Sequence, residues 1–309
     1  MNRNFEDNVR HDFERARQRA FLHDLVAVFA RRPNDLIPYH EVRRRVSPEG
    51  ESYRGLQTVR IDQIVGSMDR FDDFDRAYFP RKRFTAGRWQ NVDRAYYQDV
   101  RLPPIQLYKV GDVYFVKDGN HRVSVAREKG QEFIDAEVIE GHIRVPFYAS
   151  MAPDELLLQA EYAEFLRRTD LDRLHPEHDI RPTALGRYDE IWQHIEGHRC
   201  WLEAIRHGPV TVHDAVEDWY EYIYRPIVQV ARERGVTDRF PNRTEADIYL
   251  WVVRHRWELE RQLGHDVGPT ASAVDYADHV RPSSPWRAAL DRLRSWRPFG
   301  GRQAESVGD

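Results

Sequence analysis

The chain has 309 residues, 41 % of them hydrophobic, and a formal net charge of −4 although 32 % of the residues are charged. This length predicts two domains, or one domain with extensions, and the hydrophobic content suffices for buried cores. The mixed charge argues against a polycation that binds nucleic acid or membranes over its whole surface. A single cysteine, Cys200, excludes an internal disulfide and a multi-thiolate metal site, and it fits a reducing compartment.

The N-terminal segment, residues 1–48, predicts an Arg-rich helical extension. Its apolar residues recur at helical spacing until Pro33 and Pro38 interrupt the pattern. Nothing in this segment resembles a signal peptide, and the longest apolar runs of the chain, 25–30 and 248–253, are far shorter than the ~20 residues that cross a bilayer. We therefore expect a soluble, cytoplasmic protein that does not enter a membrane.

Residues 49–150 predict an α/β unit. Four segments have the pattern of short strands, namely residues 56–64, 105–110, 113–117 and 133–139. Gly111-Asp112 supplies a two-residue hairpin turn between the second and the third of them. A short amphipathic helix that ends at Gly130 precedes the last strand.

The loop between the third strand and the helix carries the polar run Asp118-Gly119-Asn120-His121-Arg122. The first amides of a helix lack intrahelical acceptors and lie at the positive end of its dipole, so such a junction suits an anion. A guanidinium beside these amides grips phosphate oxygens with two parallel donors. We therefore predict nucleotide or phosphate contacts from the start of the helix, namely from Gly119, Asn120, His121, Arg122 and Ser124.

Each of these residues also has a purely structural interpretation. Gly119 can serve a turn that needs a positive φ, and Asp118 can cap the helix. His121 can be a satisfied structural histidine, and Arg122 can pair with a local carboxylate. Phosphoryl chemistry would in addition need a carboxylate that orients a nucleophile or holds Mg²⁺, and Asp118 is the candidate for that catalytic role.

The order strand, Gly-x-x-Arg, helix, Gly and strand, within residues 56–140, resembles the ParB/sulfiredoxin superfamily. In ParB-type nucleotide switches this step reads Gly-Glu-Arg-Arg and holds a nucleotide triphosphate, and Gly119 and Arg122 match it. In sulfiredoxins the step reads Gly-Cys-His-Arg and binds ATP, so that His121 matches as well. Asn120 stands at the position of the catalytic Cys, and without a thiol the repair of sulfinic acid has no nucleophile. Sulfiredoxin activity is therefore excluded.

The resemblance implies an α+β fold. A small ParB/sulfiredoxin-like mixed sheet with helices would form a nucleotide-binding domain at 49–150, between the N-terminal extension and a mainly α-helical C-terminal domain. It also implies a bacterial-type nucleotide-dependent switch that binds CTP or ATP, with Mg²⁺ and with NTP hydrolysis or phosphoryl transfer as additions. Membership of a superfamily does not by itself fix the function.

Two other functions stay open. A DNA-binding ParB-like partition or transcription-type factor would place the basic run Arg81–Arg83, with Arg88 and Trp89, on DNA. Residues 151–210, however, show neither a compact pair of short helices nor a basic charge. A non-catalytic interaction module would keep the fold with a degenerate pocket and would form a homodimer.

Residues 151–299 predict the α-helical C-terminal domain, followed by a disordered tail at 300–309. Its helical segments are 153–168, 188–206, 212–234, 245–263 and 285–296. Seven of the eight Trp residues lie in this part, among Ile, Leu and Val at helical intervals. This placement favours a helical core with an interface over a groove that stacks bases.

Glu190, His194 and His198 recur at i, i+4 and i+8 and would share one face of a helix. Two His at this spacing bind zinc or iron together with a carboxylate. The protease motif, however, needs Glu directly after the first His, whereas Glu196 lies two residues on. We therefore predict no metal site and interpret these residues as an exposed or interfacial polar stripe. A metal site formed by Glu190, His194 and His198 stays as the alternative.

Overall fold

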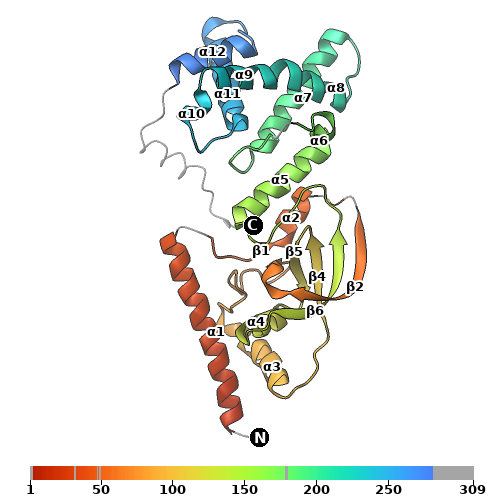
Figure 1. Ribbon diagram of the computed structural model, residues 1–309, viewed down its shortest axis with the longest axis vertical. Helices are drawn as coiled ribbons and strands as arrows, with labels where there is room; N and C mark the ends of the chain where they lie inside the picture. Colours follow the sequence, from red (N-terminus) through yellow and green to blue (C-terminus); the bar gives the residue numbers. More distant parts are fainter. Residues whose placement is uncertain (1–2, 31–32, 47, 49, 178–179, 281–309) are drawn as a thin grey trace, which may run out of the picture. The chain divides into compact units, whose positions relative to one another are not determined.

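The computed structural model of the protein describes residues 3–30, 33–46, 48, 50–177 and 180–280 (Figure 1). Its contacts group the chain into two compact units, which we describe separately. The first unit holds residues up to 178 together with 184–194, and the second holds 179–183 and the residues from 195 onward. The boundary predicted between residues 150 and 151 falls inside the first unit.

Within the described part of the first unit, six strands form one mixed sheet in the order β1-β3-β5-β4-β6-β2. The strands are β1 (Ile37–Pro38), β2 (Glu51–Arg60), β3 (Ile64–Ser67), β4 (Ile105–Val110), β5 (Val113–Asp118) and β6 (Phe133–Gly141). β5 pairs in parallel with β3 and antiparallel with β4, while β6 pairs in parallel with β4 and antiparallel with β2. The α+β class and the strands predicted at 105–110, 113–117 and 133–139 are confirmed.

The strand predicted at residues 56–64 is wrong in its bounds. β2 begins earlier, at Glu51, and ends at Arg60, and a 3-10 turn at Ile61–Gln63 separates it from β3. The first residues of β2 lack an alternating pattern and become a strand because β6 pairs with them along their whole length. Gly55, at a φ of +75°, accommodates the bulge in this pairing.

The helices of the first unit are α1 (Arg3–Ala30), α2 (Tyr39–Val46), α3 (Ala86–Tyr97), α4 (Asn120–Glu128), α5 (Pro153–Thr169), α6 (Leu171–Leu174) and the first turns of α7 (Arg187–Arg206). Of these, α4 and α2 lie on opposite faces of the sheet. Successive side chains of a strand point to opposite faces. On β5, Val116 packs in the cluster that includes Val123 of α4, whereas the Phe115 ring lies 5.3 Å from that of Tyr39 in α2. The α4 face carries the candidate site.

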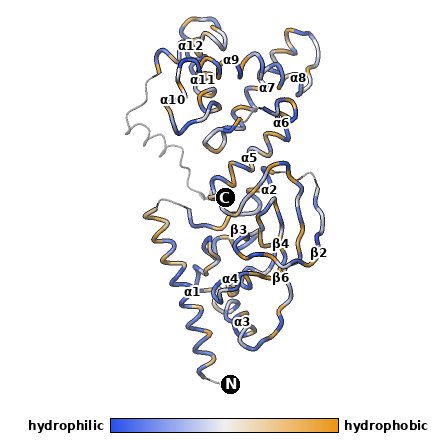
Figure 2. Tube along the Cα trace, in the orientation of Figure 1, coloured by the Kyte–Doolittle hydropathy of each residue, from blue (hydrophilic) through white to orange (hydrophobic). Residues whose placement is uncertain are grey.

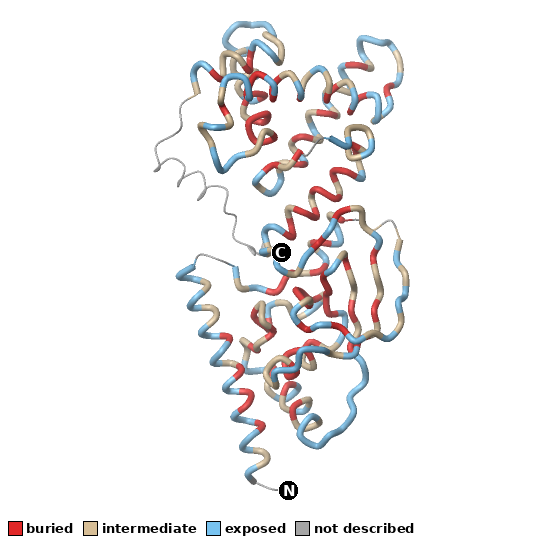
Figure 3. Tube along the Cα trace, in the orientation of Figure 1, coloured by how far each residue is buried: buried red, intermediate tan, exposed pale blue. Residues whose placement is uncertain are grey.

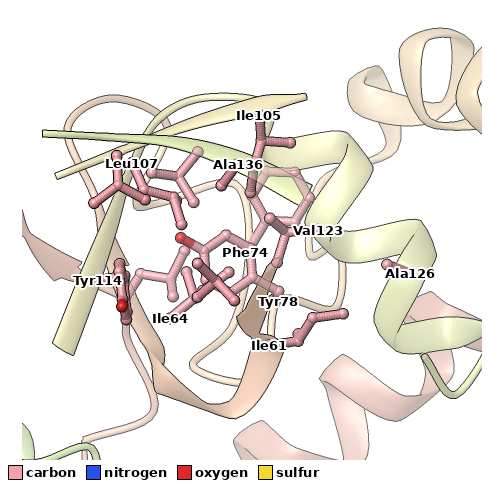
Figure 4. Packing of buried hydrophobic residues seen from close by; sticks show 14 residues of the cluster. Ile61, Ile64, Phe74, Tyr78, Ile105, Leu107, Tyr114, Val123, Ala126 and Ala136 are labelled. Atoms are coloured by element: carbon pink, nitrogen blue, oxygen red, sulfur yellow. The ribbon is translucent and has the colours of Figure 1, made fainter. Parts of the chain in front are cut away.

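The main core lies between the sheet and α4 (Figure 4). Figure 4 shows Phe74 and Tyr78, which follow β3 in sequence, between Val123 of α4 and sheet residues such as Ile105. The Tyr78 hydroxyl donates a hydrogen bond to the Gly66 carbonyl at 2.5 Å, which satisfies the polar atom that this buried ring brings into the core. The segment after β3 is therefore fixed to the core by two aromatic rings.

The N-terminal half of α1 packs against α3 and α4. Phe13 and Ala16 of α1 form a buried cluster with Trp89 of α3 and Val125 of α4. Figure 3 shows the buried residues of α1 recurring along the helix, on the side that faces these two helices. The predicted N-terminal helix is therefore part of the first unit.

A largely enclosed cation, which is 12 % exposed, also holds these three helices together. The Lys129 ammonium, which directly follows α4, lies 2.6 Å from Asp12 Oδ2 of α1 and 2.8 Å from Asp93 Oδ1 of α3. The Asp93 carboxylate is fully buried, and burial raises its pKa while Lys129 opposes that shift. Tyr97 donates a further hydrogen bond to Asp12 at 2.7 Å.

In the second unit, α7 continues and is followed by further helices and a π-helical turn. These are α8 (Val212–Trp219), the π turn (Tyr220–Tyr224), α9 (Arg225–Glu233), α10 (Val236–Arg239), α11 (Glu245–Leu263) and α12 (Pro269–His279). The helix predicted at 245–263 is confirmed as α11, and the one at 212–234 is interrupted by the π turn. The segments predicted at 285–296 and 300–309 lie outside the described residues.

The π turn places some aromatic residues of the run 219–224 in the core and leaves others exposed. Trp219 and Tyr224 are buried, and Trp219 Nε1 donates to the buried Tyr249 hydroxyl at 2.9 Å, whereas Tyr222 is exposed. The expectation that Trp residues form a core holds for Trp219 but not for the exposed Trp201 and Trp257. In the described part of the chain, no helix combines the length and the apolar character that a membrane crossing needs.

The enclosed Lys129 cation gives a stability prediction. Lys129→Met leaves the Asp93 carboxylate buried without its counter-charge, so the free energy of unfolding should fall by about 3–5 kcal/mol. Adding Asp93→Asn removes that stranded charge and should recover a large part of the loss. Urea unfolding followed by circular dichroism measures both effects, and a loss below about 1 kcal/mol for Lys129→Met would contradict the role given to this pair.

Candidate functional site

The chain passes from β5 into α4 through a single residue, Gly119. Its φ is +109°, a conformation that L side chains rarely adopt, and a Cβ atom added here would lie 2.4 Å from Cγ2 of Ile105. Only glycine fits this close approach, and glycine has no side chain to cap a helix. Among the described residues, no side chain caps α4. The first amides of α4 are thus left without a protein acceptor from a cap.

Asn120 begins α4 and is 7 % exposed. Its Oδ1 atom is buried and has no hydrogen-bond partner among the described residues. Leaving a buried polar group unpaired costs about 1–3 kcal/mol. At an uncapped helix terminus, this carboxamide oxygen is placed to accept a hydrogen bond from a ligand.

His121 follows on the same turn and is also unpaired. Both its ring nitrogens are buried without a hydrogen-bond partner, and its ring packs edge-on against Phe74 with the centroids 5.4 Å apart. Burial lowers the pKa of His121 to about 4, and the positive charges of Arg70 and Arg88 act in the same direction, against the carboxylate of Asp73. The imidazole is therefore neutral at pH 7 and offers one donor and one acceptor.

Three cations lie near this pair of residues, and we call Arg70, Lys82 and Arg88 the basic cluster. Arg70 and Lys82 share the buried Asp73 carboxylate, with N···O distances of 3.3 and 3.2 Å. Arg88 is exposed and has no ion pair with any residue that the structure describes. The sequence singled out Lys82 and Arg88 but missed Arg70, which only the packing of the segment after β3 brings near His121.

Arg122 has partners of its own in the structure. Its NH1 group donates to the carbonyl oxygens of Pro103 and Pro104 at 2.5 and 2.9 Å, and its NH2 group pairs with the carboxylate of Asp118. Arg122 therefore pairs with a local carboxylate, which is the structural interpretation of this residue in the sequence. The same pairing neutralises Asp118, whose side chain is exposed at the end of β5.

Three side chains that the sequence placed near a ligand have structural roles. Ser124 is 0 % exposed, and its hydroxyl oxygen accepts the indole hydrogen of the buried Trp89 at 2.9 Å. Arg81 is held by the carboxylates of Asp24 and Asp35. The prediction of a phosphate contact from Ser124, and of a nucleic-acid contact from Trp89, is therefore not supported by their positions, because both side chains are turned into the protein.

The three candidate metal ligands on α7, Glu190, His194 and His198, do not form a metal site in the described structure. Glu190 pairs with Arg187 at 2.6 Å, and His198 Nε2 lies 2.6 Å from the Asp218 carboxylate. Where the structure describes the chain, no group of three His, Cys, Asp or Glu side chains is arranged to hold a metal ion. His194 shares the helix with both but forms no such group with them.

A cavity of about 400 Å³ opens on the side of α4 that carries Arg122. Its wall is mainly apolar and includes Tyr96, Val100, Leu102 and Phe133, all of which are partly exposed. Arg122 contributes the cationic part of the wall. Asp135 adds a negative charge to the same wall, and the cavity is open to solvent.

His121 gives a prediction about pH. The unfolded chain protonates this group near pH 6.5 and the folded chain only near pH 4, so stability is lost as the pH falls through this window. We expect the wild type to lose about 1–2 kcal/mol more than His121→Gln between pH 7 and pH 4.5, after allowance for residual contact with solvent. Urea unfolding at both pH values measures the difference, and equal losses would argue against a neutral, unpaired imidazole.

We compared the chain with protein-family models, with curated proteins and with solved structures, and none of them matches it. A function can therefore be argued from two sources only. One is the geometry of the α4 terminus, and the other is the resemblance of the sequence around Gly119 and Arg122 to the ParB/sulfiredoxin superfamily.

Proposed function

We propose that the first unit binds a nucleoside triphosphate, with its phosphates at the N-terminus of α4. The observation that carries this proposal is the pair of buried, unpaired side chains, Asn120 and His121, at an uncapped helix terminus. Such polar groups are normally satisfied, and a ligand that satisfies them recovers the cost of their burial.

The chemistry of the terminus favours an anion. The amides of the first turn, the imidazole N–H of His121 and the Nδ2 group of Asn120 are all donors. Arg70 and Arg88 add positive charge close enough to His121 to lower its pKa. An anion bound among these groups would gain from the helix dipole as well as from both guanidinium groups.

A nucleotide satisfies more of the site than phosphate alone. The unpaired Oδ1 of Asn120 needs a donor, which a phosphate oxygen cannot supply but a ribose hydroxyl can. The apolar cavity beside Arg122 would take the nucleoside part. Binding without catalysis, as in a switch, agrees best with the nearby carboxylates. Asp118 is paired with Arg122 and Asp73 with Arg70, so neither is free to orient a nucleophile or to hold Mg²⁺.

Calorimetric titration with CTP, ATP and GTP, each with and without Mg²⁺, tests the proposal. Inorganic triphosphate is included to separate the phosphate contribution from that of the nucleoside. We expect one nucleotide to bind more tightly than triphosphate, and Arg88→Ala to weaken it about 10-fold or more through the loss of a charged contact. Arg88 is the better choice than Arg122, whose removal would also release the carbonyls of Pro103 and Pro104.

Arg83→Ala serves as the matched control, because Arg83 is an exposed arginine of the same segment and does not contribute to the pKa shift of His121. It should change the affinity by less than about threefold. Heat signals absent for every nucleotide, or an equal loss in both variants, would contradict the proposed site.

A further inference from the structure

The C-terminal half of α1 presents a large apolar face to solvent. Its residues share one side of the helix and lack any charge. We call them the outer α1 face, and they are Phe21, Leu22, Leu25, Val26, Val28 and Phe29. Figure 2 shows apolar residues recurring in this part of α1, and Figure 3 shows the same part largely exposed.

The polar residues of this half-helix point the other way, toward the rest of the unit. His23 Nδ1 lies 2.8 Å from the Asp75 carboxylate, and Asp24 accepts hydrogen bonds from Asn34 and Arg81. The usual pattern of a surface helix, with apolar residues inward and polar residues outward, is thus reversed here.

The exposed area is large for a monomer. Phe21 and Phe29 are 62 % and 86 % exposed. At about 150–250 Å² for a whole aromatic side chain, these two alone expose on the order of 200–350 Å². The four aliphatic residues bring the outer α1 face to the roughly 800 Å² that each partner contributes to a standard interface, within a factor of two. Continuous apolar patches of this size usually mark a site of protein association.

We infer that the partner of this face is the same face on a second copy of the chain. The order of side chains is nearly symmetric about Leu25, since Phe21 and Phe29 lie four residues to either side and Leu22 and Val28 lie three. In an antiparallel pair of helices related by a twofold axis, Leu25 meets Leu25 and each Phe21 meets Phe29 of the other copy. A twofold contact pairs each residue with its counterpart reciprocally, and this order places apolar side chains opposite each other at positions 21, 22, 25, 28 and 29. The inference does not depend on nucleotide binding.

Sedimentation of the full chain over a range of micromolar concentrations measures its state of association and so tests this inference. The wild type should sediment as a dimer, and Val26→Asp, which buries two carboxylates in the apolar contact, should shift it to monomer by at least 100-fold in dissociation constant. Gln18→Asp is the control, because Gln18 is exposed on the same helix but precedes the patch. It should leave the dimer intact, and circular dichroism confirms that both variants fold.

Cysteine cross-linking tests the antiparallel arrangement in a Cys200→Ser background, which removes the one native thiol. Leu25→Cys should oxidise to a covalent dimer, because a disulfide requires Cα atoms within about 7 Å and the twofold axis passes this residue. Phe21→Cys alone should not, whereas an equal mixture of Phe21→Cys and Phe29→Cys should. A monomeric wild type, a dimer that survives Val26→Asp, or cross-linking of Phe21→Cys to itself would each overturn the inference.

Discussion

The close approach of Gly119 to Ile105 is the constraint on which the candidate site depends. It excludes any residue with a Cβ atom between β5 and α4, so the chain enters the helix through a glycine, which has no side chain to cap it. The amides that a serine or aspartate would otherwise satisfy remain available. Asn120 and His121 lie in the first turn of this helix, where their buried polar atoms have no partner among the described residues and the His121 ring packs on Phe74.

The arginines of the first unit divide into two groups according to what they contact. Arg81, Arg122 and Arg127 are held by carboxylates or by main-chain carbonyls: Arg81 joins its segment to α1, and the other two join α4 to the chain before β4 and to the turn after β2. Arg88, in contrast, has no ion pair within the described chain, and Arg70 shares its one carboxylate with Lys82. The formal net charge of −4 therefore does not describe this part of the surface, where Arg70 and Lys82 share one carboxylate and Arg88 has none among the described residues. The arrangement of nearby charges, rather than their sum over the chain, decides where an anion is attracted.

Local patterns in the sequence sufficed for the elements next to the site. The hairpin at Gly111-Asp112, the strand before it and the helix start at Asn120 each carry a signal within a few residues, and the structure has all three. The extent of β2 and the position of Arg70 could not be predicted in this way. Both follow from contacts between distant segments, namely the pairing of β2 with β6 and the packing of the segment after β3 on the core.

The same reasoning explains why single side chains near the site were misjudged. Ser124 and Trp89 are 35 residues apart in sequence, and nothing local indicates that their hydroxyl and indole groups meet. Arg122 was ambiguous because a guanidinium suits a phosphate and a carbonyl equally well, and only the course of Pro103 and Pro104 shows which one is nearby. Sequence patterns thus identify the types of group at a site more reliably than their partners.

The contact between His23 and Asp75 links the outer helix α1 to the chain segment that borders the α4 terminus. Asp75 belongs to the segment that also supplies Phe74 against His121 and Asp73 beside Arg70. One short stretch of chain is therefore anchored to α1 on one side and borders the α4 terminus on the other. If association through α1 changes the affinity of the α4 terminus for a ligand by some factor, that ligand changes the strength of the association by the same factor. Breaking the His23–Asp75 contact would remove the one direct link between α1 and this stretch that we describe.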